Sequence, residues 1–167
     1  MASEPRLRPA EQADLPAIQA IYAAEVRDGA ATFELEPPDT VELGLRLAKV
    51  QSLGLPWLVA ELDGRAAGFA YAAMYRDRPA YRFTVEDSVY VARWARGTGL
   101  GRQLLEAVVA GSSAAGMRQM VAVIGDSANQ GSIRLHRACG FDNVGTLRDV
   151  GFKFDRWLDT VLMQRSL

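Results

Sequence analysis

The sequence predicts an α/β (α+β) fold in which one mixed sheet carries helices on both of its faces. Three observations predict it. Residues 84–91 are rich in β-branched and aromatic side chains and lead into a glycine-rich turn and a helical apolar pattern. Residues 120–124 are almost wholly apolar, which is typical of a central strand buried on both faces. Helical and strand patterns alternate in the order β-α-α-β-β-β-α-β-α-β-β.

The first third of the chain predicts a short strand and two helices. Arg6–Arg8 form the strand, and Asp14 is placed to cap a helix that ends at Asp28-Gly29. A loop covers residues 30–38. Asp39 or Thr40 then begins a second helix, whose apolar residues are Val41, Leu43, Leu45, Leu47 and Val50.

The remaining elements follow from turn residues and helix caps. Residues 57–75 predict a hairpin that turns at Asp63-Gly64, and the long helix after the glycine turn ends near Gly116. Asn129 is placed to cap a further helix that Gly140 closes. The last two strands are expected over residues 142–150 and 157–164, joined by a loop over residues 151–156.

Length and composition narrow the class of protein. A chain of 167 residues suits one domain over residues 1–167, and a formal net charge of -1 gives no reason to expect nucleic-acid binding. One cysteine excludes an internal disulfide and a cysteine-based zinc cluster, and the acidic residues lack metal-ligand spacing, so we expect no metal. No apolar run reaches the ~20 residues of a membrane span, and no signal-peptide core is present. A cytoplasmic protein that is not membrane-bound is the expectation.

The glycine-rich turn over residues 96–101 predicts an anion site. Glycines let the backbone approach a ligand, and the N-terminus of the following helix offers free N–H groups and a favourable dipole. A dinucleotide fingerprint would need glycine where Arg102 stands, and the Gly-Lys-Ser/Thr of a Walker loop is absent. A simple helix cap without a ligand remains an alternative on these residues alone.

The pattern Arg96-x-x-Gly99-x-Gly101 resembles the pyrophosphate loop of the GNAT family of N-acetyltransferases, which holds acetyl-CoA. A closer resemblance covers nearly the whole chain, and its most specific string is Tyr81-x-x-Thr84-x-Glu86-x-Ser88-Val-Tyr-Val91. Together with Ser132-Ile-Arg-Leu-His136 it is similar to the phosphinothricin acetyltransferase branch, which includes enzymes acting on methionine sulfoximine and methionine sulfone.

This resemblance implies a mostly antiparallel sheet of about seven strands. It also implies direct transfer of acetyl from acetyl-CoA to the α-amine of a small amino acid, in a ternary complex, by a homodimer. One departure concerns the acceptor: branch members often carry Trp where this chain has Tyr75, just before Arg76. The identity of the amino acid therefore stays open.

The resemblance places acetyl-CoA against three segments. Residues 89–91 would supply backbone N–H groups where their strand splays from its neighbour, the glycine turn would hold the pyrophosphate, and the helix capped by Asn129 would reach the cofactor amide. The donor-binding residues are thus Val89, Tyr90, Val91, Arg96, Gly97, Thr98, Gly99, Leu100, Gly101, Arg102, Asn129 and Ser132.

Two residues are candidates for proton transfer. Glu86 lies on the signature strand and suits the base that makes the amine neutral, although a solvated strand residue is the alternative. His136 is the only histidine and stands seven residues after Asn129, where most GNAT enzymes have the tyrosine that protonates the thiolate. An imidazole titrates near neutrality and suits that role, with a packed helix histidine as the alternative.

The acceptor side is expected to use the loop before the signature strand, because arginine binds carboxylate or phosphinate oxygens through two parallel hydrogen bonds. Lys153 is expected to reach the pocket across a dimer. The acceptor-binding residues are thus Phe33, Arg76, Asp77, Arg78, Tyr81, Thr84, Glu86, Asp87, Ser88 and Lys153.

Two other readings of the same residues remain. An enzyme of this fold with another acceptor, such as a polyamine, an antibiotic or a protein N-terminus, would share the donor loop. A non-catalytic acetyl-CoA-binding module would keep the glycine turn and lose the acid and base, but Glu86 and His136 are both present.

Overall fold

The computed structural model describes residues 4–167 and contains one seven-stranded sheet, in the order β1-β2-β3-β4-β5-β7-β6. Only β4 and β5 pair in parallel, so the predicted mixed, mostly antiparallel sheet is confirmed. The strands are β1 Arg6–Pro9, β2 Trp57–Leu62, β3 Arg65–Met74, β4 Thr84–Val91, β5 Gln119–Gly125, β6 Asp142–Lys153 and β7 Arg156–Ser166.

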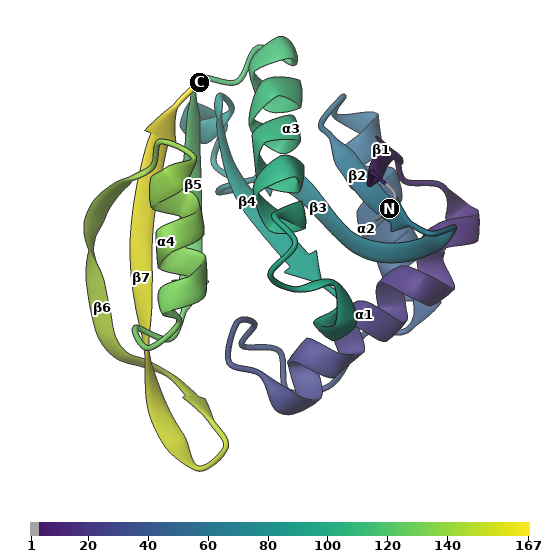
Figure 1. Cartoon of the computed structure of the whole chain (residues 1–167). Coiled ribbons are helices and arrows are strands. Elements are labelled where there is room, and N and C mark those ends of the chain that lie inside the picture. The colour runs from purple at the N-terminus through teal and green to yellow at the C-terminus, as the bar shows by residue number, and fades with distance from the viewer. Residues whose placement is uncertain (1–3) are drawn as a thin grey trace.

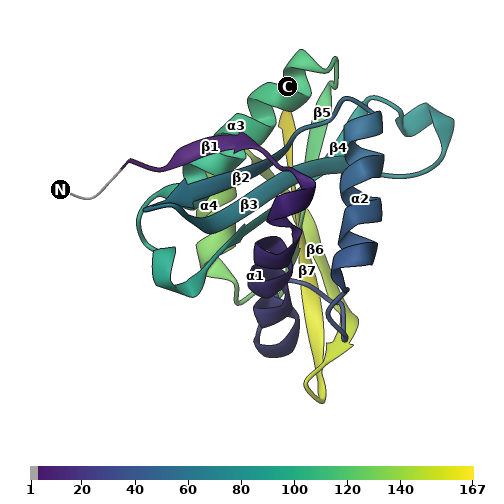
Figure 2. The same ribbon diagram turned by 90° about the vertical axis from the view of Figure 1, so that its right-hand side faces the viewer.

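Two pairs of helices cover opposite faces of this sheet, as Figures 1 and 2 show. The pair α1 and α2 lies on one face, and the pair α3 and α4 lies on the other. Their bounds are α1 Leu15–Asp28, α2 Thr40–Ser52, α3 Leu100–Ala114 and α4 Gln130–Ala138. The predicted order of helices and strands is therefore confirmed. Among residues 4–167 no helix has the length and apolarity needed to cross a membrane.

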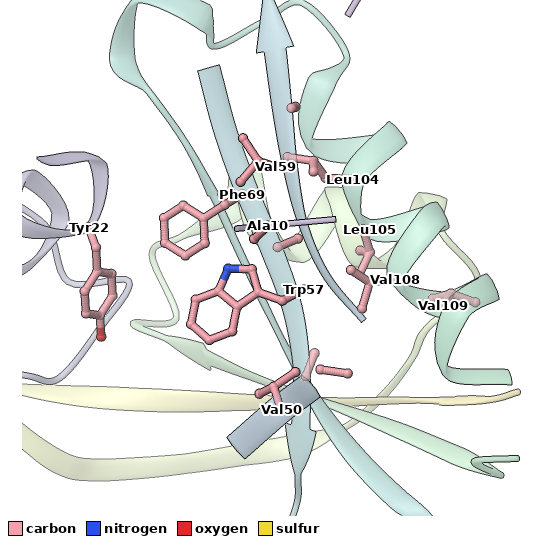
Figure 3. Packing of buried hydrophobic residues seen from close by; sticks show 14 of the residues in the cluster. Ala10, Tyr22, Val50, Trp57, Val59, Phe69, Leu104, Leu105, Val108 and Val109 are labelled. Atoms are coloured by element: carbon pink, nitrogen blue, oxygen red, sulfur yellow. The ribbon is translucent and has the colours of Figure 1, made fainter. Parts of the chain in front are cut away.

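The core on the α3 face is formed by one apolar stripe of that helix. Leu104, Leu105 and Val108 are fully buried and face β2 and β3 (Figure 3). On the opposite face of the same strands, Trp57 stacks on Tyr71 with ring centroids 4.0 Å apart. These two layers fix β3 against β4 and so hold the site-bearing strand in place.

Several local expectations are confirmed. The Asp39 side chain accepts a hydrogen bond from the Glu42 N–H at 2.8 Å and caps α2. Asp63 and Gly64 both have positive φ, which suits the tight turn between β2 and β3. Asn129 accepts from the Ser132 N–H at 3.2 Å and caps α4.

Other expectations are wrong, and tertiary contacts explain why. Asp14 does not cap α1 with its side chain, because its carboxylate instead accepts from the Arg8 guanidinium and the Glu11 N–H. On α2, Val41 and Leu45 are exposed rather than packed. On β5, Val123 is 38% exposed because it borders a cavity, so this strand is not buried on both faces.

The expected loop over residues 151–156 is also wrong. β6 continues to Lys153, and a two-residue turn at Phe154 and Asp155, both with positive φ, leads into β7. Gly151 has a structural reason to be glycine, since a Cβ there would overlap the Phe33 ring. The extra strand length thus supports the segment between α1 and α2.

That segment, residues 29–39, is tied down at several points and is called the α1–α2 loop below. Lys153 Nζ donates to the Thr32 carbonyl at 2.8 Å, and the Thr32 hydroxyl lies 2.9 Å from the Tyr22 hydroxyl. The Phe33 ring also lies against Gly125 of β5. The loop therefore has a defined position beside the end of β5.

Candidate active site

β4 and β5 separate in the middle of the sheet. Their parallel pairing covers only Thr84, Val85 and Glu86 on β4, although β4 continues to Val91 (Figure 1). The Thr84 carbonyl and the Ala92 N–H both bond to the β3 side, so strand alternation turns the backbone groups of residues 87, 89 and 91 toward β5. The predicted splay is thus present, and the Val89 and Val91 N–H groups face the opening.

A cavity of about 340 Å³ lies at this splay and is bordered by residues of α1 and α2 and by residues of α4. β3 and β4 are in register with Ala73 opposite Glu86 and Tyr71 opposite Ser88, so Glu86 and Ser88 share the face that α1 and α2 cover. We call this space the acceptor cavity. Its walls are Tyr22, Ala31, Thr32, Phe33, Glu34, Arg46, Tyr71, Glu86, Asp87, Ser88, Val89, Tyr90, Val123, Ile124, Gly125, Asn129, Ser132, His136 and Thr160.

Glu86 has the properties of a base that works near neutral pH. Its pKa is raised to about 7, mainly because burial disfavours the charged form. The negative charge of the neighbouring Asp87 contributes to this rise, and the positive charge of Arg76 opposes it. A carboxyl group with such a pKa accepts and releases protons readily at neutral pH.

Asp87 and His136 form a buried pair on the other face of β4. His136 Nε2 lies 2.9 Å from Asp87 Oδ2, and the two residues are 4% and 7% exposed. Burial works against a charged ring, but the Asp87 carboxylate outweighs it, so the pKa of His136 is raised. Nδ1 lies 2.8 Å from the Ser132 carbonyl oxygen and 3.3 Å from the Ser132 hydroxyl. Both ring nitrogens are therefore engaged.

A second cavity, of about 390 Å³, lies at the N-terminus of α3. Gly97 and Gly99 have φ of 77° and 83°, a conformation that glycine adopts without strain, and Gly99 is the N-cap of α3. We call this space the donor cavity. Its walls are Glu25, Ala31, Val89, Tyr90, Val91, Ala95, Arg96, Gly97, Gly99, Leu100, Gly101, Asn129, Gly131, Ser132 and Leu135.

The two cavities share a wall. The residues that border both are Ala31, Val89, Tyr90, Asn129 and Ser132. This wall contains the backbone of the splayed strand and the first turn of α4. A group held in one cavity can therefore react with a group held in the other.

Most predicted donor-binding residues border the donor cavity, but two do not. The Thr98 hydroxyl donates to the Ala95 carbonyl at 2.7 Å, and Arg102 pairs with Glu106 one helical turn away at 2.8 Å. Arg96 is at the cavity and forms an ion pair with Glu25 of α1. The structure thus places the glycine backbone, rather than Arg102, at the donor cavity.

The predicted acceptor-binding residues divide more evenly. Phe33, Glu86, Asp87 and Ser88 border the acceptor cavity. The side chain of Lys153 is buried within its own chain and holds the α1–α2 loop. The remaining predicted residues lie outside the cavity wall, namely Arg76, Asp77, Arg78, Tyr81 and Thr84. Of these, Arg76 still acts on Glu86 through its charge.

Sequence reasoning missed the side chains that α1, α2 and β3 contribute. Arg46 of α2 borders the acceptor cavity and pairs with Glu34 at 2.7 Å and with Glu42 at 3.0 Å. Tyr22 and Tyr71 complete this side. Glu42 and Arg46 stand four residues apart, a spacing typical of a solvent-exposed helix pair, so no local pattern in the sequence indicates a binding role for Arg46.

Comparison with known proteins agrees with this geometry. The family model for an acetyltransferase (GNAT) domain matches residues 7–162. The phosphinothricin N-acetyltransferase of Alcaligenes faecalis is 58% identical over 92% of this chain and 78% of that protein. The L-methionine sulfoximine/L-methionine sulfone acetyltransferase of Pseudomonas aeruginosa is 41% identical over 96% of this chain and 94% of that protein.

A solved structure gives the same result for the fold. The crystal structure of a GNAT superfamily phosphinothricin acetyltransferase from Sinorhizobium meliloti, in complex with acetyl-CoA, matches with a TM-score of 0.95. It is 48% identical and covers 98% of this chain and 88% of that chain. The predicted resemblance is confirmed, and the chain belongs to the GNAT family of acetyltransferases.

Proposed function

We propose that this protein transfers acetyl from acetyl-CoA to the α-amine of a small amino acid such as phosphinothricin, methionine sulfoximine or methionine sulfone. The observation that carries the proposal is the wall shared by the two cavities. It lies between a glycine turn suited to a pyrophosphate and a carboxyl group whose pKa is raised to about 7. The named activities of the relatives from Alcaligenes faecalis and Pseudomonas aeruginosa support this choice of acceptors.

The reaction proceeds by direct transfer within a ternary complex. Glu86 takes a proton from the acceptor ammonium, directly or through water, and the free amine attacks the thioester carbonyl carbon. Backbone N–H groups of the splayed strand, at Val89 and Val91, face the opening and stabilise the oxyanion. The C–S bond then breaks, and the thiolate accepts a proton that comes from the direction of His136, which lies next to Ser132 of the shared wall.

The acceptor cavity suits a small amino acid in size and in chemistry. Its volume of about 340 Å³ lies near the lower end of ligand pockets. The Arg46 guanidinium on its wall suits a carboxylate or phosphinate oxygen, and the Glu34 carboxylate beside it suits an ammonium group. The positive charge of Arg76, which lies outside the cavity wall but acts on Glu86, adds to the attraction for an anionic acceptor.

We further propose that a single domain over residues 1–167 carries the activity, and that it works in the cytoplasm as a homodimer. The edge strand β6 and its neighbour β7 expose apolar side chains that a second copy of this chain can cover. They include Val144, Leu147, Phe152 and Trp157. Light scattering coupled to size exclusion tests the dimer, because a monomer at micromolar concentration contradicts it.

A thiol-release assay tests the activity. Acetyl-CoA is offered with phosphinothricin, methionine sulfoximine, methionine sulfone and a set of ordinary amino acids, and the product is identified by mass spectrometry. We expect N-acetylation of at least one of the first three with kcat/KM well above that of ordinary amino acids. Turnover of none of the three contradicts the proposed acceptor class.

A further inference from the structure

Asp87, His136 and Ser132 form one hydrogen-bonded chain that crosses from β4 to the first turn of α4. Asp87 Oδ2 lies 2.9 Å from His136 Nε2, and His136 Nδ1 lies 3.3 Å from the Ser132 hydroxyl. The carboxylate and the ring are buried. The three residues thus lead from a buried carboxylate to the wall between the two cavities.

The contacts of the His136 ring determine the direction in which a proton moves along these three hydrogen-bonded residues. Nδ1 lies 2.8 Å from the Ser132 carbonyl oxygen, which only accepts hydrogen bonds, so Nδ1 carries a proton. Nε2 faces a carboxylate and carries a proton as well. The ring is therefore an imidazolium, consistent with the raised pKa of His136. Such a ring gives a proton to the Ser132 hydroxyl and has no lone pair with which to take one.

That direction excludes one familiar use of the three residue types. A serine nucleophile needs a neutral histidine that removes its proton, and here the adjacent nitrogen is already protonated. An acetyl-serine intermediate is thus disfavoured, and an acid role is favoured.

The position of Ser132 makes it the residue of the three that can reach the departing sulfur. Of the three residues, Ser132 alone borders both cavities, whereas Asp87 and His136 border only the acceptor cavity. Thiolate sulfur would be produced at the shared wall, where the thioester must meet the amine. The imidazolium needs a group that reaches that wall, and the Ser132 hydroxyl is 3.3 Å from its Nδ1.

We propose that the Ser132 hydroxyl protonates the leaving thiolate and is itself reprotonated by His136. This inference rests on the proposed acetyl transfer. The O–H bond of Ser132 breaks as the S–H bond of CoA forms, and the N–H bond at Nδ1 breaks as a new O–H bond forms on Ser132. The ring is left neutral, with its Nε2–H donating to Asp87. A proton from water restores the imidazolium after product release.

The first experiment compares Ser132→Ala with Ser132→Thr, which retains a hydroxyl. With the best acceptor from the thiol-release assay, we expect kcat of Ser132→Ala to fall by about a hundredfold or more. KM for acetyl-CoA should change less than about twofold, and Ser132→Thr should keep most of the wild-type kcat. Gln130→Ala is the matched control, because Gln130 lies in the same turn of α4, is exposed and borders neither cavity.

The second experiment combines Ser132→Ala with His136→Gln. If the two residues act in one relay, the double variant is no slower than the slower single variant. Should His136→Gln fail to fold, the rate is measured in mixtures of H₂O and D₂O. The relay moves two protons, so wild-type single-turnover rates should depend on the deuterium fraction along a curve, and those of Ser132→Ala along a straight line.

Three results would overturn the relay while wild-type turnover still supports the acetyl transfer. They are unchanged kcat in Ser132→Ala, a loss confined to KM for acetyl-CoA, and multiplicative losses in the double variant. Absence of turnover by the wild-type protein with every acceptor would overturn the proposed function and the relay together.

Discussion

Glu86 and Asp87 are adjacent in the chain, and β4 turns their carboxyl groups to opposite faces of the sheet. Glu86 shares the α1–α2 face with Ser88, while Asp87 pairs with His136 of α4. Burial raises the pKa of the Glu86 carboxyl group to about 7, and the Asp87 carboxylate in turn raises the pKa of the His136 ring. Strand alternation thus separates the proposed base, Glu86, from the carboxylate that pairs with His136.

Replacing Glu86 with Gln should remove the base and leave donor binding intact. We expect kcat to fall by about 10² or more, since general base catalysis contributes on that order. In the wild-type protein kcat/KM should fall as pH decreases through about 7, because Glu86 becomes protonated there. Acetyl-CoA affinity, measured by calorimetry, should be unchanged. Glu36→Gln is the control, because Glu36 is exposed on the α1–α2 loop and borders neither cavity. Undiminished turnover in Glu86→Gln would remove Glu86 from the mechanism.

The Glu86 side chain should also lower the free energy of unfolding at neutral pH. Its pKa is about 7 in the folded state against an ordinary value of 4.5, so between these pH values the folded state binds more protons than the unfolded state. The free energy of unfolding therefore falls as pH rises through this window. Relative to wild type, Glu86→Gln should gain up to about 3 kcal/mol between pH 4.5 and pH 8. Urea unfolding at both pH values measures this, and a pH-independent difference would contradict the raised pKa.

Gly151→Ala should displace the α1–α2 loop. A Cβ at this position would overlap the Phe33 ring, and such overpacking costs about 1–3 kcal/mol. We expect a higher KM for the acceptor with little change in KM for acetyl-CoA. Gly145→Ala in the same strand is the matched control, since nothing lies within 4 Å of its Cβ. Adding Phe33→Ala to Gly151→Ala should recover part of the stability that Gly151→Ala loses. Equal Tm values for Gly151→Ala and Gly145→Ala would argue against the contact between residue 151 and Phe33.

Gly99→Ala should affect the donor side instead. Gly99 has a φ of 83°, which costs an L-residue about 1–2 kcal/mol, and it borders the donor cavity. We expect lower stability together with a higher KM for acetyl-CoA. Gly116→Ala is the control, because Gly116 has a φ of 85° at the opposite end of α3 and lies outside the cavity. Equal KM values for the two variants would show that strain alone accounts for the effect.

Features set by neighbouring residues were predictable from the sequence. The Asp39 cap, the Asp63-Gly64 turn and the glycine turn before α3 all depend on a few adjacent positions, and the structure confirms each. Glu86 and Ser88 share one face for an equally local reason, because they stand two residues apart on a strand.

Features set by tertiary packing were not predictable. Arg46 and Tyr71 reach the acceptor cavity only because α2 lies across β3, and no residue near them in sequence signals it. Lys153 was expected to cross a dimer, but its Nζ binds the Thr32 carbonyl within the same chain. The exposure of Val123 likewise depends on where β4 leaves β5. Each case needed the arrangement of distant segments.

The short parallel pairing of β4 and β5 has a consequence for how this protein can change over evolution. Each cavity has mostly its own walls, and the residues from α2 and β3, Arg46 and Tyr71, border the acceptor side alone. Substitutions there can select a new amine without disturbing the glycine turn that lines the donor cavity. A new acceptor preference is therefore open to mutation one residue at a time, while the donor stays the same.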